Sequence, residues 1–286
     1  MPGEPDSCAA GGGVPAGAAL PGEAGAGSRP RLAEPLVEGT VDGVRVAVPR
    51  GATILEAARL CAIEIPTLCH HEGLPPEGSC RLCLSETRGS LAVSCMYPLR
   101  ESGFAALTRS PAVLEARRYV LSLLVCRAPR APRIRKLADE YGVSPDPRFM
   151  RDPDGCIRCG RCVRACRASG PEAIALCGRG FARLVTGPFG RPPEACVGCL
   201  ACALACPTGK IAFSERDGVR RIWEREFELA PCPECGKRAF TREQLAFLGG
   251  GASALCHSCR RRLMARELGK AAALEAPGGP ALLRAL

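Results

Sequence analysis

Apolar and polar residues alternate from Leu36 onward, on both sides of Asp42-Gly43. Alternation around a short turn of this composition predicts a β-hairpin. A helix is expected directly after the hairpin, because Thr53 and Glu56 have the spacing of a capping box. The apolar stripe of this helix consists of Ile54, Leu55, Ala58 and Leu60.

Two further helices are expected in the middle of the chain. Ser110 is a typical N-cap and Pro111 suits the first helical position, so residues 110–126 are predicted to form an amphipathic helix. Its apolar positions are Val113, Leu114, Tyr119, Val120, Leu123 and Leu124. A shorter helix over residues 134–141 is expected to end at Gly142. Both helices are interpreted as structural connectors.

Composition favours several small domains over one large core, because only 4% of the 286 residues are aromatic. Residues 1–35 are mostly Gly, Ala, Pro and Glu, and are expected to be a disordered tail. They lack the basic start and apolar stretch of a signal peptide. The chain nowhere contains about eighteen consecutive apolar residues, so no membrane span is predicted.

The chain contains 20 cysteines, and most of them occur in C-x2-C or C-x2-C-x2-C-x3-C runs. Such spacings are typical of metal ligands rather than disulfides. Because thiolate ligands persist in a reducing compartment, the expected location is the cytoplasm. Four cysteines outside the runs receive no assigned role: Cys8, Cys61, Cys126 and Cys177. Cys61 is interpreted as a small buried residue on the first helix, and Cys177 is expected to be packed.

The formal net charge of +10 counts every cysteine as neutral. Metal-bound cysteines are thiolates, and each four-thiolate site carries a net charge of about −2. Four such sites lower the net charge of the chain to roughly +2. The arginines near the cysteines are then explained as counterions of anionic clusters, and the charge does not favour nucleic acid as a partner.

Residues 65–95 contain the ligands expected for a [2Fe-2S] cluster, namely Cys69, Cys80, Cys83 and Cys95. Glycines and prolines between the first two cysteines permit an irregular backbone whose N–H groups point at the sulfurs. The alternating segment around Arg88-Gly89 predicts a second hairpin that delivers Cys95 as the fourth ligand. Hairpin, helix, cluster loop and hairpin together indicate a β-grasp ferredoxin.

Two four-cysteine runs, at residues 156–166 and 196–206, are the most specific signal in the chain. In two-cluster ferredoxins each run provides three ligands to one cubane and its fourth ligand to the other. The first [4Fe-4S] cluster is therefore assigned to Cys156, Cys159, Cys162 and Cys206. The second is assigned to Cys196, Cys199, Cys202 and Cys166. Two independent zinc knuckles are the alternative, although they would not need eight ligands.

A last pair of C-x2-C motifs supplies Cys232, Cys235, Cys256 and Cys259. Thr241 and Gln244 between them indicate a short helix with a capping box. The spacing suits a structural zinc ribbon closed by four thiolates, and a mononuclear iron site of similar geometry is the alternative. His257 is not expected to be a ligand, because four cysteines already close this site. His70 and His71 are interpreted as solvent-side or tuning groups rather than ligands.

From about residue 36 to 213 the chain resembles the amino-terminal region of the large iron-sulfur subunit of complex I. Similar regions occur in the diaphorase iron-sulfur subunit of NAD-reducing hydrogenases and at the start of iron-only hydrogenases. The resemblance rests on Ile65-Pro66-Thr67-Leu68-Cys69-His70, Gly78-Ser79-Cys80-Arg81-Leu82-Cys83, Cys95 and both four-cysteine runs. Ten residues separate Cys69 from Cys80, whereas plant-type ferredoxins have four there.

The resemblance implies electron relay between a flavin or nicotinamide subunit and a distant catalytic centre. Longer members of the family carry a further cluster held by one histidine and three cysteines just after the ferredoxin domain. Residues 96–155 contain no histidine and only Cys126, so that cluster is expected to be absent. The terminal zinc-ribbon-like segment has no counterpart in the family pattern.

The expected fold class is α+β, with the domains in the following order. Residues 36–108 form the [2Fe-2S] ferredoxin domain and 109–150 the helical connector. Residues 151–215 form a bacterial-type ferredoxin domain with two [4Fe-4S] clusters. A zinc-ribbon-like module over 228–265 precedes a tail over 266–286.

The predicted function is that of an electron-transfer subunit in a multisubunit oxidoreductase. The partners would be a flavin- or NAD(P)H-binding subunit and a catalytic hydrogenase or dehydrogenase subunit. A catalytic subunit is an alternative, although neither a Gly-x-Gly-x-x-Gly motif after a strand nor a phosphate loop is found. A redox-sensing regulator that contacts nucleic acid is another alternative, and its only local support is Arg260-Arg261-Arg262.

Overall fold

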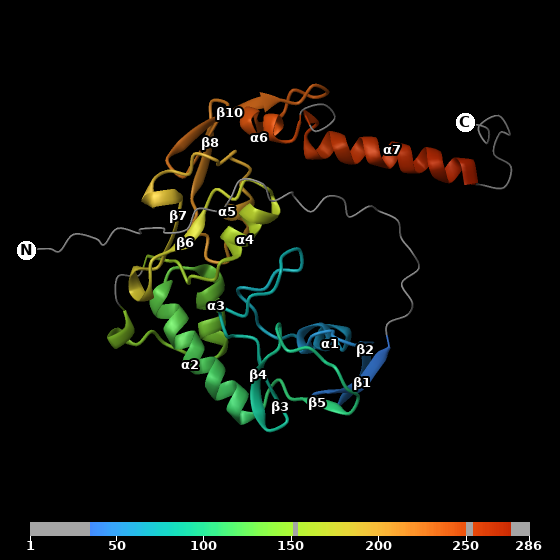
Figure 1. The fold of residues 1–286 in the computed structure, drawn as a ribbon, viewed down its shortest axis with the longest axis vertical. Coiled ribbons are helices and arrows are strands. Elements are labelled where there is room, and N and C mark those ends of the chain that lie inside the picture. Colours follow the sequence, from blue (N-terminus) through green and yellow to red (C-terminus); the bar gives the residue numbers. More distant parts are fainter. Residues whose placement is uncertain (1–34, 151–153, 250–253, 276–286) are drawn as a thin grey trace, which may run out of the picture. The chain divides into compact units, whose positions relative to one another are not determined.

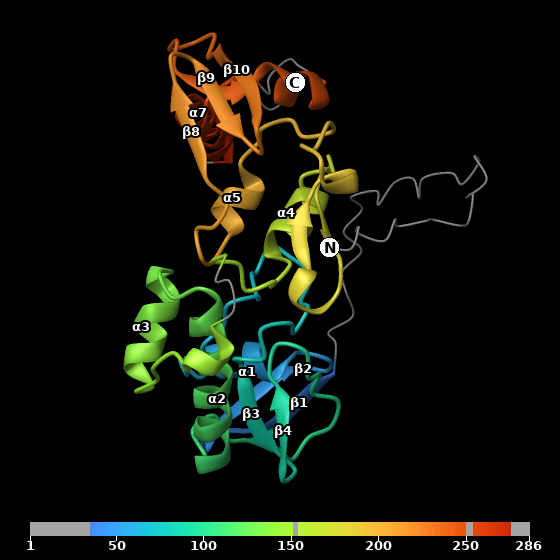
Figure 2. The same ribbon diagram turned by 90° about the vertical axis from the view of Figure 1, so that its left-hand side faces the viewer.

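The computed structural model describes residues 35–150, 154–249 and 254–275. The tail expected over residues 1–35, with Cys8, lies outside this part except for Pro35, and so do residues 276–286. Helices and strands are mixed along the described chain (Figures 1 and 2). Within these ranges no helix combines the length and the apolar character needed to cross a bilayer.

The first sheet contains three strands in the order β2-β1-β5. Strand β1 (Leu36–Val41) is antiparallel to β2 (Val44–Pro49), which confirms the first predicted hairpin, and parallel to β5 (Phe104–Ala106). Helix α1 (Ile54–Leu60) packs on β1 and β2 and covers the core of this sheet. The largest side chains of that core are Val37, Val41, Val48, Ile54, Leu55 and Phe104. Cys61 caps α1 and is only half-buried.

The predicted capping box at the start of α1 is confirmed. Thr53 Oγ1 accepts the Glu56 N–H at 3.3 Å, and Glu56 Oε2 accepts the Thr53 N–H at 2.7 Å. We expect Thr53→Ala to lower the free energy of unfolding of this region by about 1 kcal/mol, because a helix N–H loses its acceptor. Urea unfolding measures the loss. The exposed control Ser90→Ala should change stability by less than about 0.5 kcal/mol, and equal losses would contradict the assignment.

The second predicted hairpin is also confirmed, with β3 (Leu84–Thr87) antiparallel to β4 (Ser90–Val93). Helix α2 (Pro111–Arg127) packs on β3, and α3 (Pro132–Glu140) lies beside α2 (Figure 1). Ser110 Oγ accepts the Val113 N–H at 3.3 Å, as the N-cap prediction requires.

The buried face predicted for α2 was wrong in part. Tyr119 is 63% exposed, whereas the buried positions are Val113, Arg117, Leu121, Val125 and Cys126. These positions mostly recur every four residues. The buried Arg117 guanidinium donates from its two Nη atoms to the Leu84 carbonyl and the Tyr141 hydroxyl, whereas its Nε has no hydrogen-bond partner among the described residues. The apolar pattern could not include Arg117, because it counts only apolar residues as buried. Arg117 is nevertheless buried, because residues distant in sequence accept its hydrogen bonds.

The two four-cysteine runs contain α4 (Arg161–Ala168) and α5 (Ala201–Ala205), which pack on each other. The segment between the runs forms a hairpin of β6 (Ala175–Cys177) and β7 (Leu184–Thr186). Three short 3₁₀ turns complete this region: Pro147–Phe149, Gly180–Ala182 and Pro188–Gly190. Cys177 was expected to be packed but is exposed, because it ends a two-stranded ribbon.

A second sheet follows, with four antiparallel strands in the order β11-β10-β9-β8 (Figure 2). Its strands are β8 (Phe213–Arg216), β9 (Val219–Ile222), β10 (Arg225–Pro231) and β11 (Arg238–Thr241). Residues 216–227 lie between two predicted domains and were not assigned to either. The turn residues Asp217-Gly218 were the signal that could have identified the β8–β9 hairpin.

Helix α6 (Arg242–Phe247) begins at the predicted N-cap, where Thr241 Oγ1 accepts the Gln244 N–H at 3.0 Å. The predicted capping box is only half-formed, because Gln244 Oε1 is buried without a hydrogen-bond partner. Helix α7 (His257–Glu275) continues through residues 266–275, which were expected to be a tail. Ala, Leu, Lys and Glu in this segment favour helix.

Candidate iron-sulfur and metal centres

The four cysteines assigned to the [2Fe-2S] cluster are all buried and lie close together. The backbone N–H of Cys69 donates to Cys80 Sγ at 3.5 Å, and the N–H of Cys80 donates to Cys69 Sγ at the same distance. Hydrogen bonds from the Cys80 and Cys95 thiols lower the pKa of Cys69. A hydrogen bond from the Cys95 thiol likewise lowers the pKa of Cys83. The four sulfurs therefore converge on one place.

Both histidines next to this site contact groups other than the cysteine sulfurs. His71 Nδ1 accepts the Gly73 N–H at 3.2 Å. His70 Nδ1 lies 3.4 Å from Arg59 Nη2, and burial and this guanidinium lower its pKa.

The cysteines assigned to the first cubane line one cavity of about 400 Å³, to which each of the two runs contributes. These residues are Cys156, Cys159, Cys162 and Cys206. Burial raises the pKa of Cys159 to about 11 and that of Cys162 to about 12. Burial has the same effect at Cys206, but hydrogen bonds from Thr208 and nearby backbone N–H groups outweigh it and lower the pKa. The cavity has room for a cluster and four sulfurs to hold it.

The cysteines assigned to the second cubane line another cavity and are Cys166, Cys196, Cys199 and Cys202. This cavity is much narrower, about 10 Å³. N–H groups already point at the sulfurs: Ala173 donates to Cys166 Sγ at 3.2 Å and Gly198 to Cys196 Sγ at 3.4 Å. Such donors favour thiolates.

Each cavity combines three cysteines of one run with the fourth cysteine of the other. The packing of α4 against α5 produces this exchange. Cys166 lies within α4, and Cys206 directly follows α5. Each cavity is thus lined by the four cysteines of one predicted set, and their role as cluster ligands stays a prediction.

Side chains of the first run hold the [2Fe-2S] loop. Arg164 Nη2 donates to the Cys69 carbonyl at 2.6 Å, and Arg164 also pairs with Glu77 at 2.8 Å. The buried Arg161 donates to the Leu68 carbonyl at 3.1 Å. In the opposite direction, the Ser79 hydroxyl donates to the Cys159 carbonyl at 3.1 Å. Ligand loops of two candidate centres are thus joined by direct hydrogen bonds.

Side chains of the second sheet hold the other run, a role that the sequence analysis missed. Arg220 Nη1 donates to the Gly198 carbonyl at 2.7 Å, and Arg225 Nη1 donates to the Cys196 carbonyl at 3.0 Å. Phe227 packs against Gly198 so closely that a Cβ there would lie 2.9 Å from its ring. The loop that carries Cys196 and Cys199 therefore depends on residues outside any cysteine motif.

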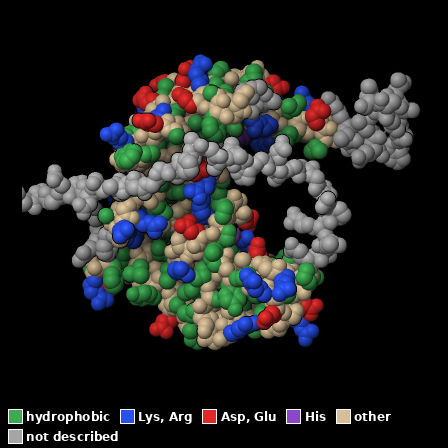
Figure 3. All heavy atoms as spheres, viewed as in Figure 1, with side chains coloured by type: hydrophobic (Ala, Val, Ile, Leu, Met, Phe, Trp, Pro, Cys, Tyr) green, Lys and Arg blue, Asp and Glu red, His purple; other side chains and the backbone are tan. Residues whose placement is uncertain are grey.

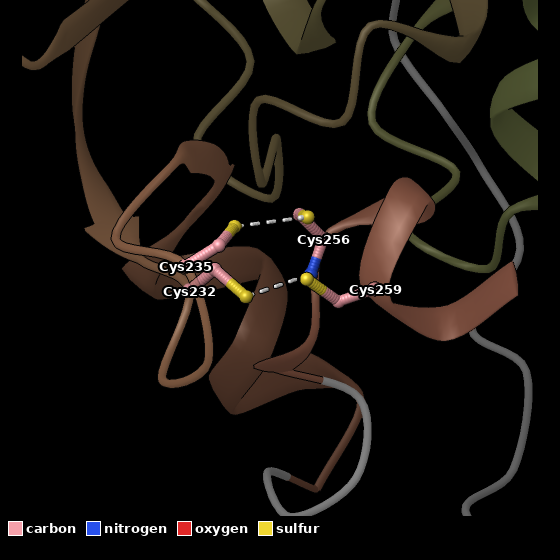
Figure 4. A group of neighbouring side chains, drawn as sticks. All are labelled: Cys232, Cys235, Cys256 and Cys259. Atoms are coloured by element: carbon pink, nitrogen blue, oxygen red, sulfur yellow. Dashed lines mark hydrogen bonds between the residues drawn. The ribbon is translucent and has the colours of Figure 1, made fainter. Parts of the chain in front are cut away.

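The terminal cysteines come together as predicted: all four Sγ atoms lie within 4.8 Å of one another (Figure 4). The Sγ atoms of Cys235 and Cys256 are 3.6 Å apart. Four sulfurs about 2.3 Å from a central ion would be separated by about 3.8 Å, so the set fits a tetrahedral metal. The Cys256 N–H lowers the pKa of Cys232 to about 6. Arg262 donates to Cys259 Sγ at 2.9 Å and adds positive charge to this site.

Comparison with known proteins identifies part of the chain. Residues 34–109 match the family described as "2Fe-2S iron-sulfur cluster binding domain". The chain is 34% identical over 187 residues to the NADP-reducing hydrogenase subunit HndD of Solidesulfovibrio fructosivorans. It is also 34% identical, over 168 residues, to the NADH-ubiquinone oxidoreductase 75 kDa subunit of Reclinomonas americana.

These matches cover 52% and 49% of this chain, but only 31% and 24% of the two relatives. A solved structure described as an NAD+-reducing [NiFe]-hydrogenase in the H2-reduced state is also similar, with a TM-score of 0.54 and 29% identity. That match covers 60% of this chain and 85% of the other. Residues 34–109 are therefore a 2Fe-2S iron-sulfur cluster binding domain, and the chain is a homologue of these NADH-ubiquinone oxidoreductase and NADP-reducing hydrogenase subunits.

Proposed function

We propose that this chain relays single electrons through one [2Fe-2S] and two [4Fe-4S] clusters inside a multisubunit oxidoreductase. The observation that carries the proposal is the grouping of twelve cysteines into three sets, two of which exchange their fourth member. The relatives named above are subunits of NADH-ubiquinone oxidoreductase and NADP-reducing hydrogenase. The proposed partners are accordingly a flavin- or NAD(P)H-binding subunit and a catalytic hydrogenase or dehydrogenase subunit.

The proposed order of the centres is [2Fe-2S], first cubane, second cubane. The [2Fe-2S] loop and the first run share the hydrogen bonds of Arg161, Arg164 and Ser79. The two cubane sites are adjacent because their cavities share Trp223 as a lining residue. Because neighbouring sites share hydrogen bonds or a lining residue, electrons could pass from one cluster to the next in this order.

Iron-sulfur clusters supply one-electron redox chemistry when bound, and the residues of this chain would tune it. Buried cysteines keep water away from the sulfurs, and backbone N–H groups stabilise the negative charge of the thiolates. Arg158 and Arg161 place positive charge beside the first set; Arg158 also pairs with Asp154 at 2.7 Å. Hydrogen bonding, burial and local charge are the means by which a protein sets cluster potentials.

We further propose that the terminal cysteine set binds a structural zinc ion. Four thiolates complete a tetrahedron and leave no position open for a substrate. A mononuclear iron would fit the same tetrahedron and is distinguished by metal analysis. Because the cysteine ligands need a reducing environment, the cytoplasm is the proposed location.

The charge on one face of the described chain does not favour a nucleic-acid partner. On the face shown in Figure 3, Lys and Arg side chains are interspersed with Asp and Glu side chains. Several arginines of the described chain are engaged in ion pairs, including Arg220 with Glu215 and Arg242 with Glu228. These contacts fit counterion and structural roles.

Anaerobic purification of the chain with its co-purifying proteins tests the proposal. We expect about ten iron atoms and about one zinc per chain, together with the EPR signals of one [2Fe-2S] and two [4Fe-4S] clusters after reduction. The co-purifying subunits would identify the enzyme. Zinc in place of most of the iron, after careful reconstitution, would contradict electron relay and favour a structural or regulatory zinc protein.

A further inference from the structure

Trp223, the only tryptophan of the chain, lies where the two candidate cubane sites meet. Its side chain is half-buried and lines both cavities, the one with Cys159 and the one with Cys202. The indole Nε1–H donates to Cys202 Sγ at 3.4 Å. A side chain from the second sheet therefore reaches a cysteine more than twenty residues away in sequence.

The backbone that holds Trp223 adopts a conformation that its residue types disfavour. Trp223 and Glu224 form the two-residue turn between β9 and β10, and their φ angles are +55° and +60°. Asn and Gly are the usual residues at such positions, because a Cβ atom is strained there. Non-glycine residues persist in this region where packing requires them, and such sites are often functional.

The turn is held in place from both sides. Ile222 and Arg225 pair across the hairpin at the base of the turn, and Ile222 is buried. Arg225 donates to three carbonyls of the loop that leads into the second run, those of Pro193, Glu194 and Cys196. These contacts fix the indole ring relative to the cysteines that it meets.

We infer that Trp223 sets the reduction potential of the second cubane through its N–H···S hydrogen bond. The inference rests on the proposed function, and it concerns a residue outside all cysteine motifs. An N–H donor stabilises the thiolate more strongly as the cluster gains an electron and its negative charge increases. Trp223 therefore favours electron arrival at the second centre, and no proton has to leave the indole in this step.

The first test uses the unaltered holoprotein. Because the chain has one tryptophan, ¹⁵N labelling of the indole marks a single nitrogen. Pulsed EPR of the reduced protein should detect hyperfine coupling of this nitrogen to the second cubane. Two normal [4Fe-4S] signals without any such coupling would overturn the inference, while the proposed relay function would stand.

The second test compares two substitutions on the same hairpin. Trp223→Phe keeps an aromatic ring but removes the N–H donor. At a given solution potential we expect the ratio of reduced to oxidised second cubane to fall about threefold, a shift of about 28 mV for a one-electron couple. The reduction potential of the first cubane should change by less than this. Redox titration followed by EPR measures both centres.

The matched control is Glu226→Gln, which removes an exposed charge from β10 without touching either cavity. It should leave both cubane potentials unchanged. Equal shifts in the two variants, or an unchanged second cubane in Trp223→Phe, would overturn the inference. Absence of both cubanes from the unaltered protein would instead contradict the proposed function itself.

Discussion

Replacing Cys206 with alanine should remove the first cubane and leave the second intact. Cys206 ends the second run, yet it lines the cavity formed by Cys156, Cys159 and Cys162 of the first. A cubane deprived of one thiolate loses an iron ligand, and no other described cysteine lines this cavity. The iron content should fall from about ten to about six atoms per chain.

EPR of the reduced variant distinguishes the crossed arrangement from its alternative. If each run held its own cluster, Cys206→Ala would damage the cubane of Cys196, Cys199 and Cys202 instead. The reciprocal variant Cys166→Ala should remove the second cubane and keep the first. Cys177→Ala is the matched control, since this cysteine is exposed and lies in neither cavity. Retention of both cubanes in Cys206→Ala would refute the assignment.

Replacing Arg220 with methionine should loosen the second sheet and the loop that carries Cys196. The Arg220 side chain is 5% exposed, and its three nitrogens donate to Glu215, the Gly198 carbonyl and the Ala239 carbonyl. Methionine fills similar space but offers no donor to these acceptors. We expect local stability to fall by about 3 kcal/mol, because unpaired buried polar groups are costly.

Hydrogen exchange measures this loss locally, which suits a chain that contains several domains. Amides of β9 to β11 should exchange about a hundredfold faster in Arg220→Met, and the second cubane should be lost more readily than the first. The neighbouring Arg221 is the matched control, because it points to the exposed face and pairs with Glu226. Arg221→Met should change stability by less than about 0.5 kcal/mol. Similar exchange in both variants would refute the role assigned to Arg220.

Local patterns were sufficient for the elements that depend on neighbouring residues. The hairpin around Asp42-Gly43, the capping box of Thr53 and the N-cap of Ser110 were all predicted, because turn and cap hydrogen bonds join residues a few positions apart. The assignment of the cysteines to ligand sets, which stays a prediction, rests on a related reason. Cluster ligands must occur at spacings that let several sulfurs reach one metal group, so the chemistry is visible as a repeat.

Contacts between residues distant in sequence determined the features that local patterns did not predict. The burial of Arg117 depends on the Leu84 carbonyl, and the role of Arg220 depends on Gly198 and Ala239. The periodicity of apolar residues along the chain contains no information about such distant acceptors. The apolar pattern therefore predicted the buried face of α2 wrongly in part and did not predict the second sheet. Trp223 likewise meets Cys202 only when the β9–β10 turn packs on α5 and its neighbouring loop. The sequence thus predicted which sulfurs bind clusters, whereas long-range packing selected the side chains that contact the cysteine loops, because those contacts exist only after the chain has folded.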